Sequence, residues 1–195
     1  MNEKIKSSIK FSLIIAVITF VLAAIFSSLS SSLLNQVSWI LGLLLVLVIV
    51  SIGIVFDMLG IASAAVKEAP LNAMAAEKVK GAREAVIIQK NADKFSSFCN
   101  DVIGDISGIV SGAALAVVII EIANIFQGNA GTSFQLLLSV VLTSLIAALT
   151  VGGKAFGKHF AINSSTSIII VAGKAIYLIE KNLKIKVLPR TKGKK

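Results

Sequence analysis

Sulfur-containing and ionisable side chains are scarce in this sequence. The 195 residues include one cysteine and one histidine, and only 15% are charged. A single cysteine excludes an internal disulfide framework and offers no metal-ligand spacing. Free cysteine usually behaves as a small apolar residue, so we interpret Cys99 as a packing residue. No nucleophile stands at a useful spacing from a base, and the sequence therefore gives little support for an enzyme.

Positive charge is missing from two long stretches, 11–66 and 95–153. Hydrophobic residues make up 56% of the chain, and its mean hydropathy is +0.91. This composition is typical of an integral membrane protein rather than a soluble one. The net charge of +9 does not indicate nucleic acid as a partner. The basic residues cluster outside the apolar runs, whereas nucleic acid needs a basic face on a folded domain.

Four apolar runs are long enough to form membrane helices. They cover residues 11–34, 37–66, 99–126 and 134–153. The first run follows three lysines, which also fits a signal peptide, but its length and the lack of an A-x-A site favour an uncleaved span. A further apolar run, 164–179, has only 16 residues and contains Lys174. We expect it to lie along the membrane interface.

The distribution of lysine and arginine predicts the orientation of these spans. The two short connections on one side, near 30–35 and 127–133, carry no basic residue. All basic residues are on the other side, so the positive-inside rule places both termini and the segment 67–94 in the cytoplasm. We therefore predict an all-α, multi-pass bundle in the cell membrane. It has about four spans, a cytoplasmic helical hairpin and an interfacial helix.

The segment 67–94 interrupts the apolar runs with ten charged residues. Pro70 suits the first turn of a helix, and Gly81 can break the segment into a hairpin. The mixture of charged and apolar residues predicts amphipathic helices at the membrane surface, with a solvated cytoplasmic loop as the alternative. We divide the chain into a basic N-terminal segment with an extra membrane helix (1–36), a transmembrane domain (37–180) and a basic cytoplasmic tail (181–195).

Acidic residues occupy the third apolar run, where an ordinary anchor would carry leucine. Asp101, Asp105 and Glu121 each cost about 3 kcal/mol at the centre of a bilayer, so such groups usually face a bundle interior, a water-filled cavity or an ion path. Glu121 is close to the outer surface, where an interfacial position suits it better. We expect this run to form the central helix of the bundle.

Glycines four residues apart lie in the same run, at Gly104, Gly108 and Gly112. Small residues at this spacing form a ridge on which a second helix can approach closely, and contact with lipid would waste them. We therefore expect a neighbouring helix to pack along this ridge.

Charged groups on three spans are expected at similar depth. Asp57 ends the second span, Asp101 and Asp105 begin the third, and Lys154 ends the fourth, all on the cytoplasmic side. Asp101 and Asp105 are four apart and share a helix face. Such a cluster could bind a cation, or Lys154 could neutralise Asp105. Alternatively, Asp57 and Asp101 only mark the headgroup boundary.

Short motifs follow one another in a recognisable order. They are Lys80-Gly81-Ala82, Asn91-Ala92-Asp93-Lys94-Phe95 and Ile103-Gly104, with residues 153–158 ending the last span. In this order they resemble the transmembrane domain of the CNNM/CorB/CorC magnesium transporters. That domain has a S-x-S-E-x-A-like helix end, a charged hairpin, a helix beginning I-G-N and a final G-E-x-x-P-K motif. The resemblance covers about residues 37–179. We expect no nucleotide-binding CBS domains, because the chain ends soon after the interfacial helix.

The sequence departs from the family pattern where the ion would bind. The resemblance implies a magnesium ion held by Ser, Glu and Asn side chains and the final Glu region. At the first motif, Ser, Ser and Glu are replaced by Asp57, Leu59 and Gly60. Further along, the Asn, Glu and Pro positions hold Asp105, Lys154 and Gly157, while Lys158 is kept. A lysine opposes a bound dication, but two carboxylates compensate, so Asp57 and Asp105 are the candidate metal ligands.

Two functions follow, and the resemblance also implies a homodimer. The first is a divergent transporter of a divalent cation, with magnesium as the transported ion and no other cofactor. The second is a non-transporting membrane subunit or regulator in which Lys154 replaces the ion and which assembles with a related transporter subunit. The lipid bilayer is the remaining expected partner.

Overall fold

The computed structural model describes residues 3–34, 38–127 and 132–183, and within them the chain is helical and contains no strand. It divides into two compact units. Unit 1 comprises Met1–Ile54 and Asp101–Gly153, and unit 2 comprises Val55–Asn100 and Lys154–Lys195. The all-α fold predicted from the sequence is therefore confirmed.

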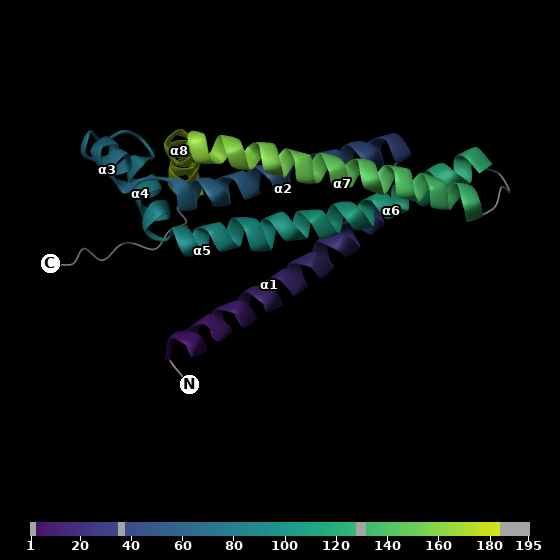
Figure 1. Ribbon diagram of the computed structural model, residues 1–195, viewed down its shortest axis with the longest axis horizontal. Helices are drawn as coiled ribbons and strands as arrows, with labels where there is room; N and C mark the ends of the chain where they lie inside the picture. The colour runs from purple at the N-terminus through teal and green to yellow at the C-terminus, as the bar shows by residue number, and fades with distance from the viewer. Residues whose placement is uncertain (1–2, 35–37, 128–131, 184–195) are drawn as a thin grey trace. The chain divides into compact units, whose positions relative to one another are not determined.

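Along the described chain, long apolar helices stand before and after a group of short helices (Figure 1). The long helices are α1 (Glu3–Leu34), α2 (Trp39–Ala65), α6 (Asp105–Gln127), α7 (Thr132–Asn163) and α8 (Ser165–Leu183). The short ones are α3 (Glu68–Ala76), α4 (Ala82–Lys90) and α5 (Ala92–Ser97), and a π-helix, η1 (Phe98–Gly104), precedes α6. Both α2 and α7 contribute residues to each unit.

Three helical segments among the described residues are long and apolar enough to cross a membrane. They are Trp39–Ala65, Ala92–Ile125 and Ser133–Asn163. They correspond to the second, third and fourth predicted spans. The first predicted span lies in α1, whose apolar stretch Ser12–Ser28 is shorter than these three. The structure thus supports three candidate spans by length and composition.

Helix α6 is the central element of unit 1. It packs against α1, and Ile106 and Val110 of α6, with Val102 of η1, are buried beside Ile15 and Leu22 of α1. Its second half forms a cluster with α2 and α7, whose buried members are Val46, Val50, Ala114, Leu115, Val118, Ile119, Ile122 and Ile146. Of the most apolar stretch of Ala92–Ile125, 56% is buried, against 22% for Trp39–Ala65 and 6% for Ser133–Asn163. Greater burial supports the central position predicted for this helix.

The close approach of α2 to α6 uses only part of the predicted glycine ridge. A Cβ placed on Gly53 of α2 would lie 2.9 Å from Cβ of Ser107 and 3.7 Å from the carbonyl oxygen of Gly104. At Gly108 and Gly112, by contrast, an added Cβ would meet nothing within 4 Å. The expectation for these two glycines was wrong, because α2 packs on the neighbouring face that carries Gly104 and Ser107.

Unit 2 is built around the hairpin of α3 and α4, which packs on α8. Pro70 lies in the first turn of α3, and Gly81 precedes α4 with φ +83°, a left-handed conformation that favours glycine. Both roles were predicted from the sequence and are confirmed. Gly173 of α8 lies so close that an added Cβ would meet the carbonyl oxygen of Gly81 and, at 2.9 Å, the backbone nitrogen of Ala85.

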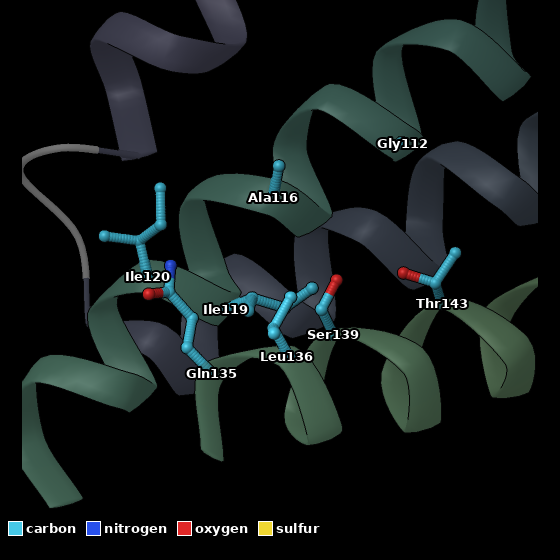
Figure 2. Close-up of a pocket in the computed structure, with 8 residues that line it drawn as sticks. All are labelled: Gly112, Ala116, Ile119, Ile120, Gln135, Leu136, Ser139 and Thr143. Carbon is cyan, nitrogen blue, oxygen red and sulfur yellow. The ribbon is translucent and has the colours of Figure 1, made fainter. Parts of the chain in front are cut away.

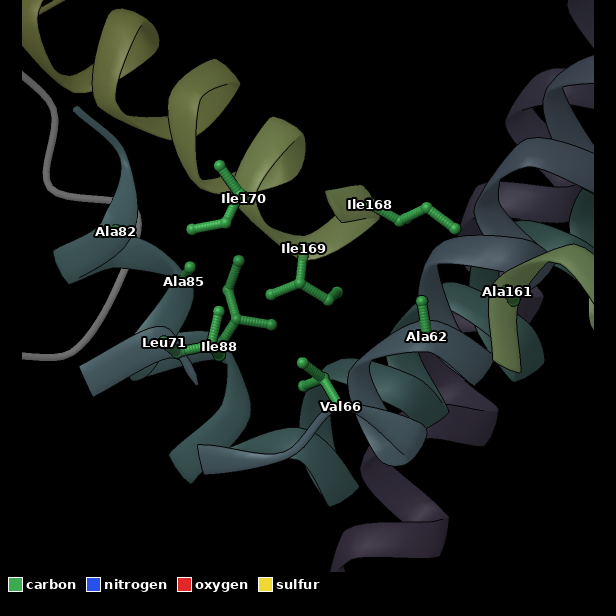
Figure 3. Close-up of a cluster of buried hydrophobic side chains, with 10 residues drawn as sticks. All are labelled: Ala62, Val66, Leu71, Ala82, Ala85, Ile88, Ala161, Ile168, Ile169 and Ile170. Atoms are coloured by element: carbon green, nitrogen blue, oxygen red, sulfur yellow. The ribbon is translucent and has the colours of Figure 1, made fainter. Parts of the chain in front are cut away.

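The core of unit 2 gathers apolar side chains from α2, α3, α4, α7 and α8 (Figure 3). Its buried members are Ala62, Val66, Leu71, Ala82, Ala85, Ile88, Ala161, Ile168, Ile169 and Ile170. Leu71, Ile88 and Ile169 are completely buried, and each such side chain contributes roughly 1.5–3 kcal/mol relative to exposure in water. The charged hairpin is therefore held by an apolar core and is not a solvated loop.

Two local features differ from the sequence expectation. Residues 98–104 form a π-helix at the start of the predicted central helix, and such turns have no simple sequence signature. Helix α7 continues to Asn163, ten residues beyond the predicted end at Gly153. Lysine and alanine are good helix formers and no proline follows, so the helix continues past the charged residues.

Candidate cation site

Asp57 and Lys154 form an ion pair in unit 2. Oδ1 of Asp57, on α2, lies 3.5 Å from Nζ of Lys154, on α7, and the two side chains are 17% and 30% exposed. The sequence correctly indicated that these two charges lie at similar depth. Within unit 2 the partner of Lys154 is Asp57, whereas Asp105 belongs to unit 1, and its expected pairing with Lys154 stays a prediction. The Nζ–Oδ1 distance of 3.5 Å is longer than that of a charge-assisted hydrogen bond. The carboxylate of Asp57 is therefore not tightly held by the lysine.

Asn100 presents an amide oxygen to α2 one helical turn beyond Asp57. A Cβ added to Gly60 would lie 2.7 Å from Cγ of Asn100 and would overlap its Oδ1. This Oδ1 is buried and has no hydrogen-bond partner among the described residues, while Nδ2 lies 3.4 Å from Oγ of Ser96. Buried polar atoms nearly always have a hydrogen-bond partner. The Oδ1 atom of Asn100 is therefore available to bind a cation or a hydrogen-bond donor.

Ser63 adds a third oxygen on the same stretch of α2. Its side chain is 1% exposed, and its hydroxyl donates a hydrogen bond of 2.7 Å to the carbonyl oxygen of Gly60. This bond uses the hydroxyl proton and leaves the oxygen lone pairs as acceptors. Asp57, Gly60 and Ser63 follow one another three residues apart, so they lie on neighbouring positions of successive helix turns.

Asp105 belongs to unit 1 and begins α6 with an exposed side chain. Among the described residues, no group of three or more His, Cys, Asp and Glu side chains is close enough to hold a metal. Unit 2 itself contains the carboxylate of Asp57 and the neutral oxygens of Asn100 and Ser63. Oxygen donors of these kinds suit Mg²⁺, which keeps several water ligands.

Sequence reasoning missed Asn100 and Ser63. Asn100 directly precedes Asp101. The acidic side chain of Asp101 is the more conspicuous signal in an apolar run, so the neighbouring amide was not recognised as a candidate ligand. The only available signal was a polar amide inside a long apolar stretch. Asn100 also lies in the π-helix η1, which the sequence did not predict.

A second feature is a groove of about 360 Å³ between α6 and α7 in unit 1 (Figure 2). It is lined by Gly112, Ala116, Ile119 and Ile120 of α6 and by Gln135, Leu136, Ser139 and Thr143 of α7. Figure 2 shows the hydroxyl groups of Ser139 and Thr143 pointing into the space beside α6. Small residues beside hydroxyl and amide groups are typical of contacts between membrane helices.

Comparisons of the chain with protein-family models, with curated proteins and with solved structures found no match. The resemblance to the magnesium transporters therefore depends on the short sequence motifs alone.

Proposed function

We propose that this chain is a divergent membrane protein of the CNNM/CorB type that transports a divalent cation, with magnesium as the transported ion. In this proposal, Asp57 supplies the negative charge and Asn100 a neutral oxygen ligand. Ser63 lies about 9 Å from Asp57 along the helix axis, so it contacts the ion only through a water ligand. The supporting observation is the buried Oδ1 of Asn100, which has no partner among the described residues. Asp105, exposed at the start of α6, serves as a separate acidic group on the path of the ion.

The same proposal includes the membrane topology expected from the sequence. Four spans, with α1 as the first, place the hairpin of α3 and α4 and both termini in the cytoplasm. The chain is then a multi-pass protein of the cell membrane. The cytoplasmic orientation of unit 2 brings Asp57 to the inner side of the bilayer.

Lys154 is the main obstacle to cation binding, because its ammonium group lies 3.5 Å from the carboxylate that would bind the ion. Like charges disfavour each other, so an arriving dication must displace this side chain. Lysine has a long and flexible stem. In this proposal the ammonium group of Lys154 competes with the ion for the carboxylate of Asp57 and moves away when the ion binds.

A magnesium titration of the melting temperature tests the transport proposal. We expect Mg²⁺ to raise Tm of the purified wild-type protein, and Asp57→Asn to abolish the rise. Lys154→Met should increase the apparent Mg²⁺ affinity by about tenfold, which corresponds to removal of about 1.4 kcal/mol of competition. The matched control is Lys158→Met, because Lys158 lies one turn further along α7 with an exposed side chain. A wild-type Tm that does not respond to Mg²⁺ would contradict the proposal.

The ion pair favours a second function, a non-transporting membrane subunit or regulator. If Lys154 permanently replaces the ion, added Mg²⁺ leaves the wild-type Tm unchanged. Lys154→Met then lowers Tm, because it leaves the partly buried carboxylate of Asp57 without its partner. The expected partner in this case is a related transporter subunit. The titration described above therefore separates the two functions, since they predict opposite responses of the wild-type protein.

We also propose a homodimer, which the family resemblance implies. Gly108 and Gly112 offer a small-residue surface for this contact, because an added Cβ there meets nothing within 4 Å. We propose that the two copies meet at Gly108 and Gly112. Gly112→Leu should then leave Tm of the single chain unchanged, but the molecular mass of the particle in detergent should fall from two chains to one. Ala147→Leu, at an exposed position of α7, is the control. A single-chain mass for the wild type would refute the homodimer.

A further inference from the structure

The chain passes three times between unit 1 and unit 2, and each crossing lies inside a helix. The crossings are at residues 54–55 in α2, 100–101 in η1 and 153–154 in α7. Each unit has a hydrophobic core of its own. The covalent connections between the units are thus three stretches of helix, and the stiffness of these stretches decides whether one unit can move against the other.

In α2, two features weaken the helix just before its crossing. The exposed hydroxyl group of Ser51 donates a hydrogen bond of 2.8 Å to the carbonyl oxygen of Leu47, four residues back. Such a bond often bends a helix. Gly53 follows, and glycine is a poor helix former. Packing accounts for Gly53, because an added Cβ would lie 2.9 Å from Cβ of Ser107, but it does not account for the serine.

Helix α7 repeats this arrangement before its own crossing. The hydroxyl group of Thr150 donates a hydrogen bond of 2.7 Å to the carbonyl oxygen of Ile146, and two glycines follow. An added Cβ on Gly153 would overlap the side chain of Ile54, so this glycine permits a close helix contact. Gly152, by contrast, is exposed, and its added Cβ would meet nothing within 4 Å. Packing does not require glycine at position 152, where it makes the helix easier to bend.

The remaining crossing lies inside the π-helix. Residues Phe98–Gly104 form η1, and the crossing at 100–101 is in its middle. Wide turns of this kind are among the few causes of sharp bends in helices and often occur at functional sites. On the α6 side, the hydroxyl group of Ser107 donates a hydrogen bond of 2.7 Å to the carbonyl oxygen of Ile103, a residue of η1. Each crossing therefore has a feature that bends helices within about one turn of it.

We propose that the three crossings form a hinge on which unit 2 tilts relative to unit 1. The bending is confined to residues 51–54, 98–104 and 150–154, and the apolar cores of both units stay intact. Asp57 belongs to unit 2 and Asp105 to unit 1, so the tilt changes the separation of these two carboxylates. The hinge is a property of the backbone and needs no bound cation. It therefore stands if the magnesium titration fails, and its own failure leaves the titration unaffected.

Distance distributions between pairs of spin labels, measured by double electron–electron resonance, test the hinge on the full chain. Cys99→Ser removes the natural thiol. Leu137→Cys in unit 1 and Glu77→Cys in unit 2 form the pair across the hinge, and both positions are exposed. Labelled protein is diluted with unlabelled protein in nanodiscs, so that only distances within one chain are recorded. We expect the distribution to be about twice as wide as for a pair within unit 2, Glu77→Cys with Leu178→Cys.

Stiffening the hinge should narrow the distribution. The stiffened variant combines Ser51→Ala, Thr150→Ala and Gly152→Ala, which remove both hydroxyl bonds to the helix backbone and the glycine without a packing contact. We expect the width across the hinge to fall to about that of the pair within unit 2. Gly108→Ala is the matched control, because it gives the same gain in helix preference inside unit 1, also without a contact within 4 Å. It should leave the width unchanged.

Two results would overturn the proposal. Equal widths for the two label pairs in the otherwise natural chain would show that the crossings do not bend. A width that stays large in the stiffened variant would place the motion outside these residues. If the triple variant does not fold, Gly152→Ala alone provides the same test, because its methyl group has no neighbour to displace.

Discussion

Gly60 and Asn100 depend on each other at the candidate site. Glycine at position 60 leaves the space into which the carboxamide of Asn100 fits, since an added Cβ would overlap Oδ1. In return, the Asn100 side chain covers the backbone of α2 at Gly60. The buried amide oxygen has no hydrogen-bond partner in the described residues and reduces stability unless it gains one. The pair is therefore better suited to a binding role than to stabilising the fold.

Gly60→Ala should lower the stability of the protein by about 1–3 kcal/mol, because the new methyl group overpacks the site. The loss of stability in Gly60→Ala arises from overlap with the side chain of Asn100 alone. Asn100→Ala should therefore remove this loss. In the Asn100→Ala background, we expect Gly60→Ala to be neutral or slightly stabilising, since alanine favours the helix by about 1 kcal/mol over glycine. Denaturation of the two single variants and the double variant measures this coupling. Equal costs of Gly60→Ala in both backgrounds would show that the two residues do not interact.

For single residues, the sequence identified the important charged side chains more reliably than it identified the residues that they contact. Asp57 and Lys154 were conspicuous because a charge in an apolar run is costly, and the structure brings them together. The choice between Asp57 and Asp105 as the partner of Lys154 depends on how each helix is rotated about its axis. That rotation follows from packing, which a single sequence does not reveal. Asn100 was missed because an amide beside a carboxylate gives no distinct signal, and it lies in a π-helix that the sequence did not predict.

Among the elements, the contact of the α3–α4 hairpin with α8 is the most tightly constrained. Two glycines from different elements, Gly81 and Gly173, lie so close that a side chain on either would meet backbone atoms of the other element. Backbone atoms cannot rotate away as a side chain can. The hairpin is therefore held in one register on α8, which in turn fixes the outward face of that helix.

Gly173→Ala should cost at least 1–3 kcal/mol, roughly the penalty for overpacking a core. The added Cβ would meet the carbonyl oxygen of Gly81 and the nitrogen of Ala85. We expect loosening of the hairpin, visible as faster amide hydrogen exchange in α3 and α4. Gly152→Ala is the matched control, because nothing lies within 4 Å of its added Cβ. It should be neutral or stabilising by up to about 1 kcal/mol. Unchanged exchange in Gly173→Ala would exclude this packing.

The elements illustrate which sequence signals are reliable. Pro70 and Gly81 act through local backbone geometry, and the hairpin was predicted from them. The small-residue ridge acts only through a neighbouring helix, and there the prediction succeeded at Gly104 but failed at Gly108 and Gly112. Four-residue spacing indicates that a close approach is possible, but it does not select the neighbour. Likewise, charged residues did not end α7, because lysine is compatible with a helix.

For the whole molecule, the distribution of charge is the main evidence for orientation. Lysine and arginine are missing from 11–66 and from 95–153, and the described candidate spans lie largely within these stretches. The hairpin of unit 2 carries charges of both signs on a buried apolar core, which suits an aqueous compartment at the membrane surface. By the positive-inside rule, these features support the proposed cytoplasmic side for unit 2.

Cysteine labelling in intact cells checks this orientation. Cys99 is 2% exposed and is removed with Cys99→Ser, so that each variant carries one new thiol. Glu77→Cys reports on the exposed end of α3, and Ser133→Cys reports on the start of the last candidate span. A membrane-impermeant maleimide should label Ser133→Cys but not Glu77→Cys in intact cells, and the reverse in inside-out vesicles. Labelling of Glu77→Cys from outside would place the hairpin and Asp57 on the outer side. The ion pair of Asp57 and Lys154 would then face the opposite compartment.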